Sequence, residues 1–589
     1  MSVASSNVIE DPQSPQSPQF TADKPTAVHL DDAGDLEKAS PSASDPLEAS
    51  FVWDLNIWLN IIALWMCFFT ATWLLVVPSS IIGFISAAFP EDASIAIWIA
   101  SSVTISNCVV QTFLGDISDH FGRKWPLLVG MALAVAGCLT AGRGSSMQMV
   151  IGGQVLNGLG LTMGYLAIPL SGEIVPKIHR APVQAGSGIF AGIAYICGPI
   201  VAGGFIKHHV GGEGEGWRGP FYLSAGLAAL TFVIVTLFYH PAPRPNPEKL
   251  SVKTRILKID WMGVFLATAG VTLFLVGLES GGNPTPWVSG RVLAFMVIGG
   301  LLIITFVIWE WRFTSHGLVD HSLFQNPNYA ICLILHLVAG IVLFGGQAFL
   351  PQEIIELFTS DAVMTGVWNI PFNVMTICGG IISAVALHFT KEAKWTILAA
   401  YTLLLVGNCL MLVMRPKINY AAWFFPTMLM GTAVGIQTAL LIIVVGISTP
   451  NHLIAAATTF AAAVRGLGGS IGTVVFSQIF RSKLLTFLPS EVAIKVLESG
   501  LPESSLPEFL DAFLAGEGAS IIPSIPGVTP AILEAAEDGV AMAYTHAFKF
   551  VWYSLIPFAA ISVIVCFWLQ STRAQLTLQV AAPVAKKQR

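Results

Sequence analysis

The sequence predicts an all-α integral membrane protein with fourteen transmembrane helices. Of its 589 residues, 54% are hydrophobic and only 11% are charged, and a soluble protein with so little charge could not cover its surface with polar groups. The apolar runs reach about 20 residues and do not alternate with polar residues, which is typical of membrane helices and not of a barrel. The sequence has no stripe of basic residues that would indicate a nucleic-acid partner.

The chain begins with a polar segment, residues 1–50, which is rich in Pro, Ser, Asp and Ala and has no apolar run. We expect a disordered tail there and not a signal peptide. Fourteen apolar spans follow, and their even number places both tails on one side of the membrane. The spans cover residues 57–80, 94–114, 126–142, 148–172, 186–206, 221–239, 260–279, 291–312, 328–350, 364–387, 395–414, 421–447, 455–480 and 546–570.

The distribution of Lys and Arg predicts the orientation. Of the 29 such residues, 18 fall on the side of the tails and 10 on the other, while Arg465 lies within a span. Because short cytoplasmic loops carry an excess of Lys and Arg, we expect both tails to be cytoplasmic. We expect the plasma membrane as the location and not the vacuole.

A charged turn at residues 115–124 joins the second and third spans. Gly115 permits close helix approach, and Gly122 permits a tight turn. Asp119 can pair with Arg123 one turn on, or lie at the positive N-terminus of another helix, and Lys124 can reach a lipid phosphate. A simple positive-inside anchor would need neither the glycines nor Asp119. We therefore interpret these five residues as a latch that closes the cytoplasmic side and breaks when that side opens.

This turn resembles the signature G-x-x-x-D-x-x-G-R-K that the major facilitator superfamily carries between its second and third spans. Ile117 stands at the usual leucine position, and His120 replaces the usual base. The resemblance implies the major facilitator fold, with two six-helix bundles that move about a central site, and it implies a transporter.

The fifth span is similar to the superfamily's antiporter motif, whose Gly-Pro pair is Gly198 and Pro199 here. Pro199 removes a backbone donor and bends the helix, and the flanking glycines permit close packing. The double glycine, Gly203 and Gly204, lies one residue later than usual. In the family this motif is associated with drug–proton antiporters and with sealing the closed state; ordinary small-residue packing is the alternative.

The fourth span departs from the family pattern R-x-x-Q-G-x-G, which falls on Gln154, Asn157, Gly158 and Gly160. The arginine that the family links to proton movement is glutamine here. Because Gln154 can hydrogen-bond but cannot hold a charge, the sequence speaks against proton coupling through this site.

Four further segments agree with the fourteen-span drug:proton antiporter branch, at residues 217–223, 259–263, 318–329 and 460–472. Within that branch the chain looks most like the fungal trichothecene efflux pump family, with fungal siderophore-iron transporters as close relatives. The resemblance covers residues 51–575 and implies an inserted helix pair. The predicted parts are tail 1–50, N-terminal bundle 51–240, linker 241–258, inserted pair 259–315, C-terminal bundle 316–570 with external loop 481–545, and tail 571–589.

Two polar segments interrupt this plan. The linker 241–258 is Pro-rich and basic, so it suits anionic lipid headgroups. The loop 481–545 is acidic and contains several prolines. It would form short interfacial helices, and we leave open whether it is a passive cap or a gate for the substrate.

Ionisable residues inside a membrane are costly, so each is a functional hypothesis. His336 lies near the middle of the ninth span and has a pKa range that suits proton exchange; a hydrogen-bonded structural histidine is the alternative. Arg465, in the thirteenth span, could pair with a carboxylate or donate to carbonyl groups. Glu173 and Glu279 lie near span ends, where an interfacial role is the alternative.

Polar and aromatic residues inside the spans could line a central cavity, although hydrogen bonding between helices is the alternative for every amide. Asn369 and Asn373 share a helix face because they are four residues apart. An uncharged cavity of this kind favours a neutral or amphipathic organic substrate. The candidates are Asn60, Gln111, Gln154, Asn157, Asn369, Asn373, Gln437, Trp73 and Trp368.

These observations predict a secondary active efflux pump for a hydrophobic organic compound, such as a toxin, a drug or a fungal secondary metabolite. We expect proton antiport by alternating access, with lipid and protons as further partners, no metal or organic cofactor, and a monomer. There is no Walker A motif for ATP and no nucleophile–base set for an enzyme. The alternatives are a siderophore-iron transporter on the same scaffold and a substrate sensor that transports nothing.

Overall fold

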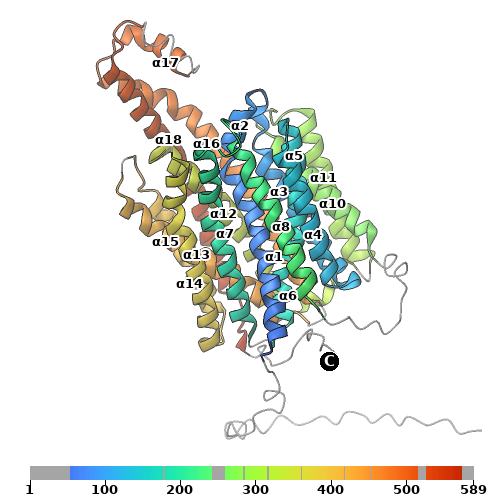
Figure 1. Ribbon diagram of the computed structural model, residues 1–589. Coiled ribbons are helices and arrows are strands. Elements are labelled where there is room, and N and C mark those ends of the chain that lie inside the picture. The colour runs from blue at the N-terminus through green and yellow to red at the C-terminus, as the bar shows by residue number, and fades with distance from the viewer. Residues whose placement is uncertain are drawn as a thin grey trace, which may run out of the picture. The chain divides into compact units, whose positions relative to one another are not determined.

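A computed structural model describes residues 53–176, 179–241, 259–282, 285–314, 317–359, 361–416, 418–450, 453–514 and 525–573. The predicted tail 1–50, most of the linker 241–258 and the end of the tail 571–589 lie outside these ranges. The helices are α1 (Leu55–Ser80), α2 (Ile82–Ala88), α3 (Trp98–Phe121), α4 (Lys124–Gly142), α5 (Met147–Tyr165), α6 (Ala167–Glu173), α7 (Arg180–Lys207), α8 (Gly219–Phe238), α10 (Trp261–Ser280), α11 (Gly290–Arg312), α12 (Pro327–Leu357), α13 (Ala362–Thr390), α14 (Lys394–Met411), α15 (Tyr420–Ser448), α16 (Ile454–Glu498), α17 (Leu506–Leu514) and α18 (Pro530–Cys566) (Figure 1).

The helices confirm the predicted all-α membrane fold. In the part of the chain that the structure describes, 13 helices are long and apolar enough to cross a membrane, with α5 and α6 counted as one. The remaining predicted span is α3, a helix of 24 residues that carries Asn107 and Gln111 in its middle. At about 1.5 Å per residue, α3 is also long enough for the hydrocarbon core.

The N-terminal half consists of α1 and α3 to α8. Helix α4 packs against α5 and α8, α1 packs against α7 and α8, and α3 packs against α5. A close backbone contact joins α4 and α5, where a Cβ on Gly137 would lie 2.6 Å from the carbonyl oxygen of Gly153. Small residues at such crossings let helix backbones approach each other, which is how helices associate where lipid supplies no hydrophobic driving force.

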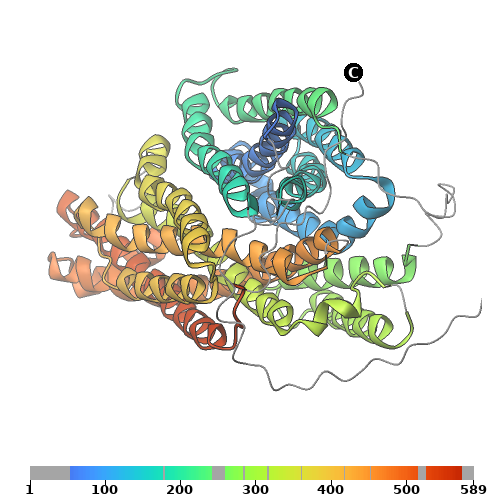
Figure 2. The same ribbon diagram turned by 90° about the horizontal axis from the view of Figure 1, so that it is seen from below.

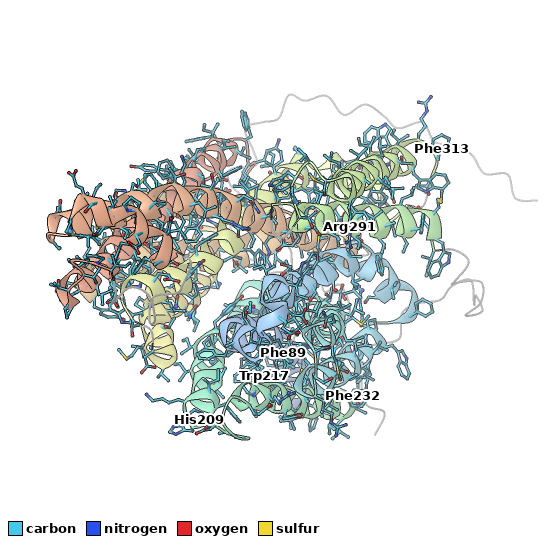
Figure 3. The ribbon with its side chains drawn as sticks, turned by 90° about the horizontal axis from the view of Figure 1, so that it is seen from above. Phe89, His209, Trp217, Phe232, Arg291 and Phe313 are labelled. Atoms are coloured by element: carbon cyan, nitrogen blue, oxygen red, sulfur yellow. The ribbon has the colours of Figure 1, made fainter. Side chains whose placement is uncertain are left out.

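Trp217 fixes one end of the N-terminal half (Figure 3). Its ring packs edge-to-face on Phe89 with centroids 5.9 Å apart, and the guanidinium carbon of Arg218 lies 4.3 Å from the ring centroid. The same guanidinium donates to the carbonyl oxygens of Gly142 and Gly144, at 3.0 and 2.7 Å. The segment at residues 217–223 therefore holds the α4–α5 turn against α8.

The C-terminal half consists of α12 to α16 and α18, and buried aromatic side chains hold it together. Helix α13 packs against α15, α16 packs against α12 and α18, and α14 packs against α15. The indole of Trp423 donates to the carbonyl oxygen of Trp368 at 3.0 Å, and the indole of Trp552 donates to the carboxylate of Glu353 at 3.0 Å. Both of these buried indole N–H groups thus have a partner, as is usual for large amphipathic rings in a core.

The two halves meet along two helix pairs, α3 with α16 and α7 with α13. Figure 2 shows the N-terminal half, blue to teal, beside the C-terminal half, yellow to red. We call the end of the bundles that carries residues 115–124 the latch end, and the opposite end the far end.

The inserted pair, α10 and α11, lies outside both halves. The two helices pack on each other, and α10 also contacts α3 and α16. Only 11% of the apolar stretch of α11 is buried, so this helix presents its side chains to lipid. At the far end, the amide of Gln478 donates to Gly281 O at 3.0 Å, and Arg481 donates to Gly282 O at 3.2 Å. The pair is thereby tied to α16.

The structure corrects the expected external loop 481–545, because the helices in its described part mainly continue the two flanking spans, with α17 as a separate short helix. Helix α16 continues to Glu498, and α18 already begins at Pro530, so α16 is about 68 Å long against a hydrocarbon core of about 30 Å. Apolar residues at helical spacing make a separate small core, including Val492, Val496, Ile532 and Ala536. We call this part the helical protrusion; its acidic side chains concealed this spacing in the sequence.

Candidate functional site

Two glycines shape the latch end. Gly122 has φ +93°, which only glycine adopts without strain, and it lets α3 end directly before α4 begins. A Cβ on Gly115 would lie 2.5 Å from both Ala456 Cα and Thr459 Oγ1 of α16. Gly115 therefore permits the contact between α3 and α16 that closes this end across the two halves.

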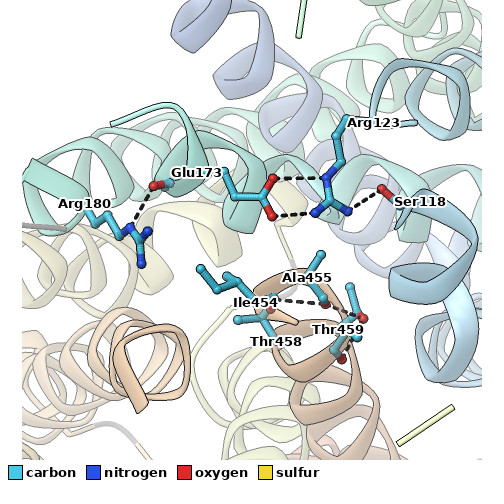
Figure 4. Close-up of polar contacts among 10 residues, drawn as sticks. Ser118, Arg123, Glu173, Arg180, Ile454, Ala455, Thr458 and Thr459 are labelled. Atoms are coloured by element: carbon cyan, nitrogen blue, oxygen red, sulfur yellow. Dashed lines mark hydrogen bonds and ion pairs between the residues drawn. The ribbon is translucent and has the colours of Figure 1, made fainter. Parts of the chain in front are cut away.

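Arg123 forms a bidentate ion pair with Glu173, a partner that the sequence did not indicate (Figure 4). Its Nε donates to Glu173 Oε2 at 3.0 Å, its Nη2 donates to Oε1 at 2.7 Å, and its Nη1 donates to Ser118 Oγ at 2.9 Å. Arg123 and Glu173 are 4% and 3% exposed. A buried pair needs such geometry to offset the desolvation of two charges. The side chain of Asp119 lies outside the described residues.

This pairing reassigns Glu173 from the candidate proton sites to the latch. The carboxylate is held by a guanidinium at both oxygens, so protonation would break a buried ion pair. Lys124 makes a contact that the sequence did not indicate, because its Nζ donates to the carbonyl oxygen of Thr236 at 2.8 Å. It thereby satisfies one of the free carbonyl groups at the end of α8.

Arg180 also lies at the latch end, although in the sequence analysis it contributed only to the distribution of Lys and Arg. It is 4% exposed, its Nε donates to Gly172 O at 2.9 Å, and its Nη1 lies 3.5 Å from Gly446 O of α15. The second contact crosses from one half to the other. The partner is 266 residues away in the chain, so no local pattern could have indicated it.

The predicted antiporter motif lies where α7 runs between α1 and α13. A Cβ on Gly198 would lie 3.2 Å from Val77 of α1, whereas a Cβ on Gly204 would meet nothing within 4 Å. Gly203 is buried, and Pro199 lies within a helix that continues to Lys207. The close packing therefore depends on the Gly-Pro region and not on both later glycines.

The contact between α7 and α13 crosses the two halves over much of its length. A Cβ on Gly192 would overlap the side chain of Ile377, and the amide of Asn373 donates to Tyr195 O at 3.4 Å. At the far end, Lys207 Nζ lies 3.4 Å from Asp361 Oδ2, and both side chains are exposed. Asn373 is thus a predicted cavity residue that the structure does place between the halves.

A second polar cluster lies deep within the C-terminal half. His336, Gln437 and Arg465 line an enclosed cavity of about 10 Å³, together with Thr438 and apolar side chains. His336 is 1% exposed and Gln437 is 3% exposed. We call these three residues the central cluster; α12, α15 and α16 each contribute one of them.

The hydrogen bond of His336 defines its tautomer. Nδ1 lies 2.8 Å from the carbonyl oxygen of Cys332, and because a carbonyl only accepts, Nδ1 must carry the proton. In the neutral ring, Nε2 is then an acceptor, and it has no partner among the described residues. The amide nitrogen of Gln437 likewise has none.

Several predicted cavity residues make hydrogen bonds within the N-terminal half. Asn60 accepts from the backbone N–H of His240 at 2.8 Å, and Trp73 donates to Ser224 Oγ at 3.0 Å. Asn157 donates to Gln154 Oε1 at 2.7 Å and accepts from Cys138 Sγ at 3.3 Å. Asn60 and Asn157 thus make the contacts between helices that were the alternative for amides, whereas Gln154 bonds within its own helix, and its Nε2 has no partner among the described residues. The assignment of these residues and of Trp73 to a cavity stays a prediction.

The remaining candidates also differ in whether they have a partner within the protein. Trp368 stacks on Phe358 with centroids 4.6 Å apart, inside an aromatic cluster of the C-terminal half, and Asn369 bonds its own helix at Thr365 O, 3.1 Å away. Glu279 accepts from Ser101 Oγ at 2.7 Å and so joins α10 to α3. Gln111 is 3% exposed, and its Oε1 has no partner in the described part of the chain.

Glu353 is a buried carboxylate that the predicted spans placed outside the ninth helix. The ninth span was expected to end at residue 350, but α12 continues through Pro351 to Leu357. Glu353 therefore lies inside the helix, is 1% exposed, and accepts from Trp552. The helical spacing of the apolar residues beyond Pro351 was the signal that could have placed it.

Comparisons with known proteins complete the description of the site. A family model described as Major Facilitator Superfamily matches residues 62–473. The MFS transporter L2 of Phoma sp. is 23% identical over 480 residues, which cover 80% of this chain and 75% of that protein. The trichothecene efflux pump TRI12 of Fusarium sporotrichioides is 22% identical over 487 residues, which cover 80% of this chain and 79% of the pump.

A solved structure shares the arrangement of helices. The major facilitator proton:xylose symporter XylE, bound to 6-bromo-6-deoxy-D-glucose, matches with a TM-score of 0.55 at 11% identity, over 89% of this chain and 98% of that one. At this identity the likeness shows the fold alone. Together the comparisons confirm the family resemblance that the motifs predicted.

Proposed function

This chain belongs to the major facilitator superfamily and is a multi-pass membrane transporter, not an enzyme, and we propose that it exports a hydrophobic organic compound by proton antiport. The names of its relatives support export of a toxin or fungal secondary metabolite. Alternating access between the two halves would carry the compound past the membrane without changing it covalently.

The cross-half closure at the latch end is the observation that carries this proposal. Gly115 admits α16 against α3, and Arg180 reaches Gly446 of α15. Neither contact is covalent, and both would break if the halves swung apart. The ion pair of Arg123 and Glu173 lies within one half, so it would survive opening and be hydrated. Such an end can open and close repeatedly, as alternating access requires.

Proton coupling is the second part of the proposal, and His336 is the residue that we assign to it. Its Nε2 faces an enclosed cavity and accepts a proton without first breaking another hydrogen bond. Glu173 is less suited because it is ion-paired. We further propose that the chain works as a monomer in the plasma membrane, with both tails cytoplasmic.

Reconstitution tests transport and coupling separately. The purified chain in liposomes, with a pH gradient imposed, should move an organic compound while internal pH changes in proportion. His336→Gln should lower proton-driven transport while leaving thermal unfolding within about 2 °C. Transport that is unchanged in His336→Gln would remove this residue from the coupling step.

Deletion in the producing organism tests the direction of transport. Metabolite profiling should find the exported compound retained in cells that lack the chain. Cells that express it should not accumulate ferric chelates. Accumulation of such chelates would contradict export and favour the siderophore-iron alternative.

A further inference from the structure

Arg465 is a cation within a membrane span that has no counter-ion among the described residues. It lies on α16 about 16 Å from the first residue of that helix, and it is half-buried. Its guanidinium makes no hydrogen bond or ion pair with any residue in the described ranges, whereas Arg123 and Arg180 are both bonded. A charge in this position is expensive, so it is expected to have a functional partner.

The ionisable neighbours of Arg465 come from both halves. Ionisable groups near enough to act electrostatically on it within the described chain include Tyr165 and Tyr195 of the N-terminal half and Tyr401 and His336 of the C-terminal half. No carboxylate is among those described neighbours. Tyr401 already donates to Leu335 O at 2.8 Å. Arg465 therefore faces the boundary between the halves with its positive charge uncompensated.

The cavity beside Arg465 offers a definite set of polar atoms. The amide nitrogen of Gln437 is a free donor, and Nε2 of neutral His336 is a free acceptor. Leaving these buried atoms unpaired costs free energy unless a ligand pairs with them. The pattern of one cation, one donor and one acceptor matches an oxyanion with a neighbouring hydroxyl group.

The size of the cavity limits what enters it. A volume of about 10 Å³ is close to what one water molecule requires. One oxygen atom of a ligand fits the same space, whereas the body of an organic compound does not. The body would lie between the halves, on the side of Tyr165 and Tyr195, once they separate.

We propose that the central cluster binds the acidic oxygen group of the exported compound: a carboxylate, phenolate or enolate. Arg465 is its counter-ion, Gln437 donates a hydrogen bond to it, and His336 Nε2 accepts one from an adjacent hydroxyl group. This inference rests on the proposed export function and names its substrate class. Of the neutral or amphipathic substrates that the sequence favoured, it selects amphipathic compounds that carry an acidic group.

A matched pair of probes tests the charge requirement. We would measure binding of 1-hydroxy-2-naphthoate and of its primary amide to the full chain in lipid nanodiscs, by isothermal titration calorimetry at pH 7.5. The two probes have nearly the same shape and differ in charge. We expect the acid to bind at least about tenfold more tightly. Equal affinities would overturn the proposal.

Variants test whether the preference for the acid over the amide depends on Arg465. Arg465→Gln should bring the ratio of the two affinities to about one, while Arg465→Lys should keep part of the preference. Gln437→Leu should weaken the acid several-fold and leave the amide unchanged. Arg481→Gln is the control, because Arg481 lies on the same helix at the far end and bonds only Gly282 O. A preference that survives in Arg465→Gln would contradict the proposal.

Transport in liposomes separates this inference from the proposed function. If the wild-type chain moves the amide but shows no preference for the acid, export stands and the anion subsite is wrong. If the chain binds the acid through Arg465 but moves neither probe, the subsite stands and export is wrong. Thermal unfolding of each variant, within about 2 °C of wild type, excludes misfolding as the cause.

Discussion

The latch end and the central cluster treat buried charge in opposite ways. Arg123 and Glu173 satisfy each other with two short hydrogen bonds, and Ser118 occupies a further N–H of the arginine. Arg465, Gln437 and His336 lie together and leave a cation, a donor and an acceptor unused. The difference shows which buried groups hold the structure and which are available for binding. The paired charges of the latch stabilise the fold, whereas the unpaired groups of the central cluster can bind a ligand.

The largest effect should come from removing one partner of the latch pair. Glu173→Ala leaves the buried Arg123 without a counter-ion, and we expect it to lower the free energy of unfolding by about 3–5 kcal/mol. Denaturant unfolding in detergent micelles would measure this. The double variant Arg123→Met/Glu173→Leu should recover most of the loss, because two apolar side chains leave no charge unpaired. A single variant as stable as wild type would contradict the account of the latch.

A larger side chain at Gly115 should break the closure without touching any charge. Gly115→Val places carbon atoms where Ala456 and Thr459 lie, and overpacking of this kind costs about 1–3 kcal/mol. We expect α3 and α16 to separate and the latch end to open. Labelling rates of a cysteine at Thr459 would rise in this variant. Gly188→Val is the control, because a Cβ there meets nothing within 4 Å.

Removing the unpaired cation, Arg465, should change stability in the opposite direction from removing Glu173. Arg465→Met deletes a desolvated charge that has no partner in the described structure, so we expect stability to stay equal or rise by about 1 kcal/mol. Transport of an acidic compound should fall at least about tenfold. The pair of measurements, unfolding and transport, distinguishes this residue from Glu173. A strong loss of stability would show that Arg465 is structural.

The smallest effect is expected at the exposed pair of Lys207 and Asp361. The N–H of Val363 lowers the pKa of Asp361 below its ordinary value, and the Lys207 ammonium adds to this. The lowered pKa means that ionised Asp361 stabilises the fold at pH values above the ordinary Asp pKa of about 3.9. This stabilisation is lost as pH falls through the lowered pKa. Asp361→Asn should therefore leave the pH profile of transport unchanged between pH 5 and about 8.

The sequence was informative wherever the signal was local. The apolar runs located the membrane helices, and Gly115 and Gly122 lie where a close approach and a positive φ require them. It could not identify Glu173 as the partner of Arg123, because 50 residues separate them. The helix extensions beyond residues 480 and 350 were missed because acidic residues and prolines there resemble loops.

The sequence could not decide the cavity assignments for a related reason. Polarity within a span indicates that a side chain has a polar role, but it does not tell whether its partner is a ligand or a neighbouring helix. Asn60 and Trp73 found partners in their own half, whereas the Nε2 atoms of Gln437 and His336 have none among the described residues. Only the three-dimensional packing separates the two cases, since the partners come from other helices.

Helix α16 runs without interruption from Ile454, beside the latch, past Arg465 and out to Glu498 in the helical protrusion. A rod of this kind acts as a lever when it tilts. A small angular change at the buried end sweeps the outer tip through a wider arc, so a spectroscopic label at Ser499 would magnify movements of the halves that are too slight to follow at the membrane centre.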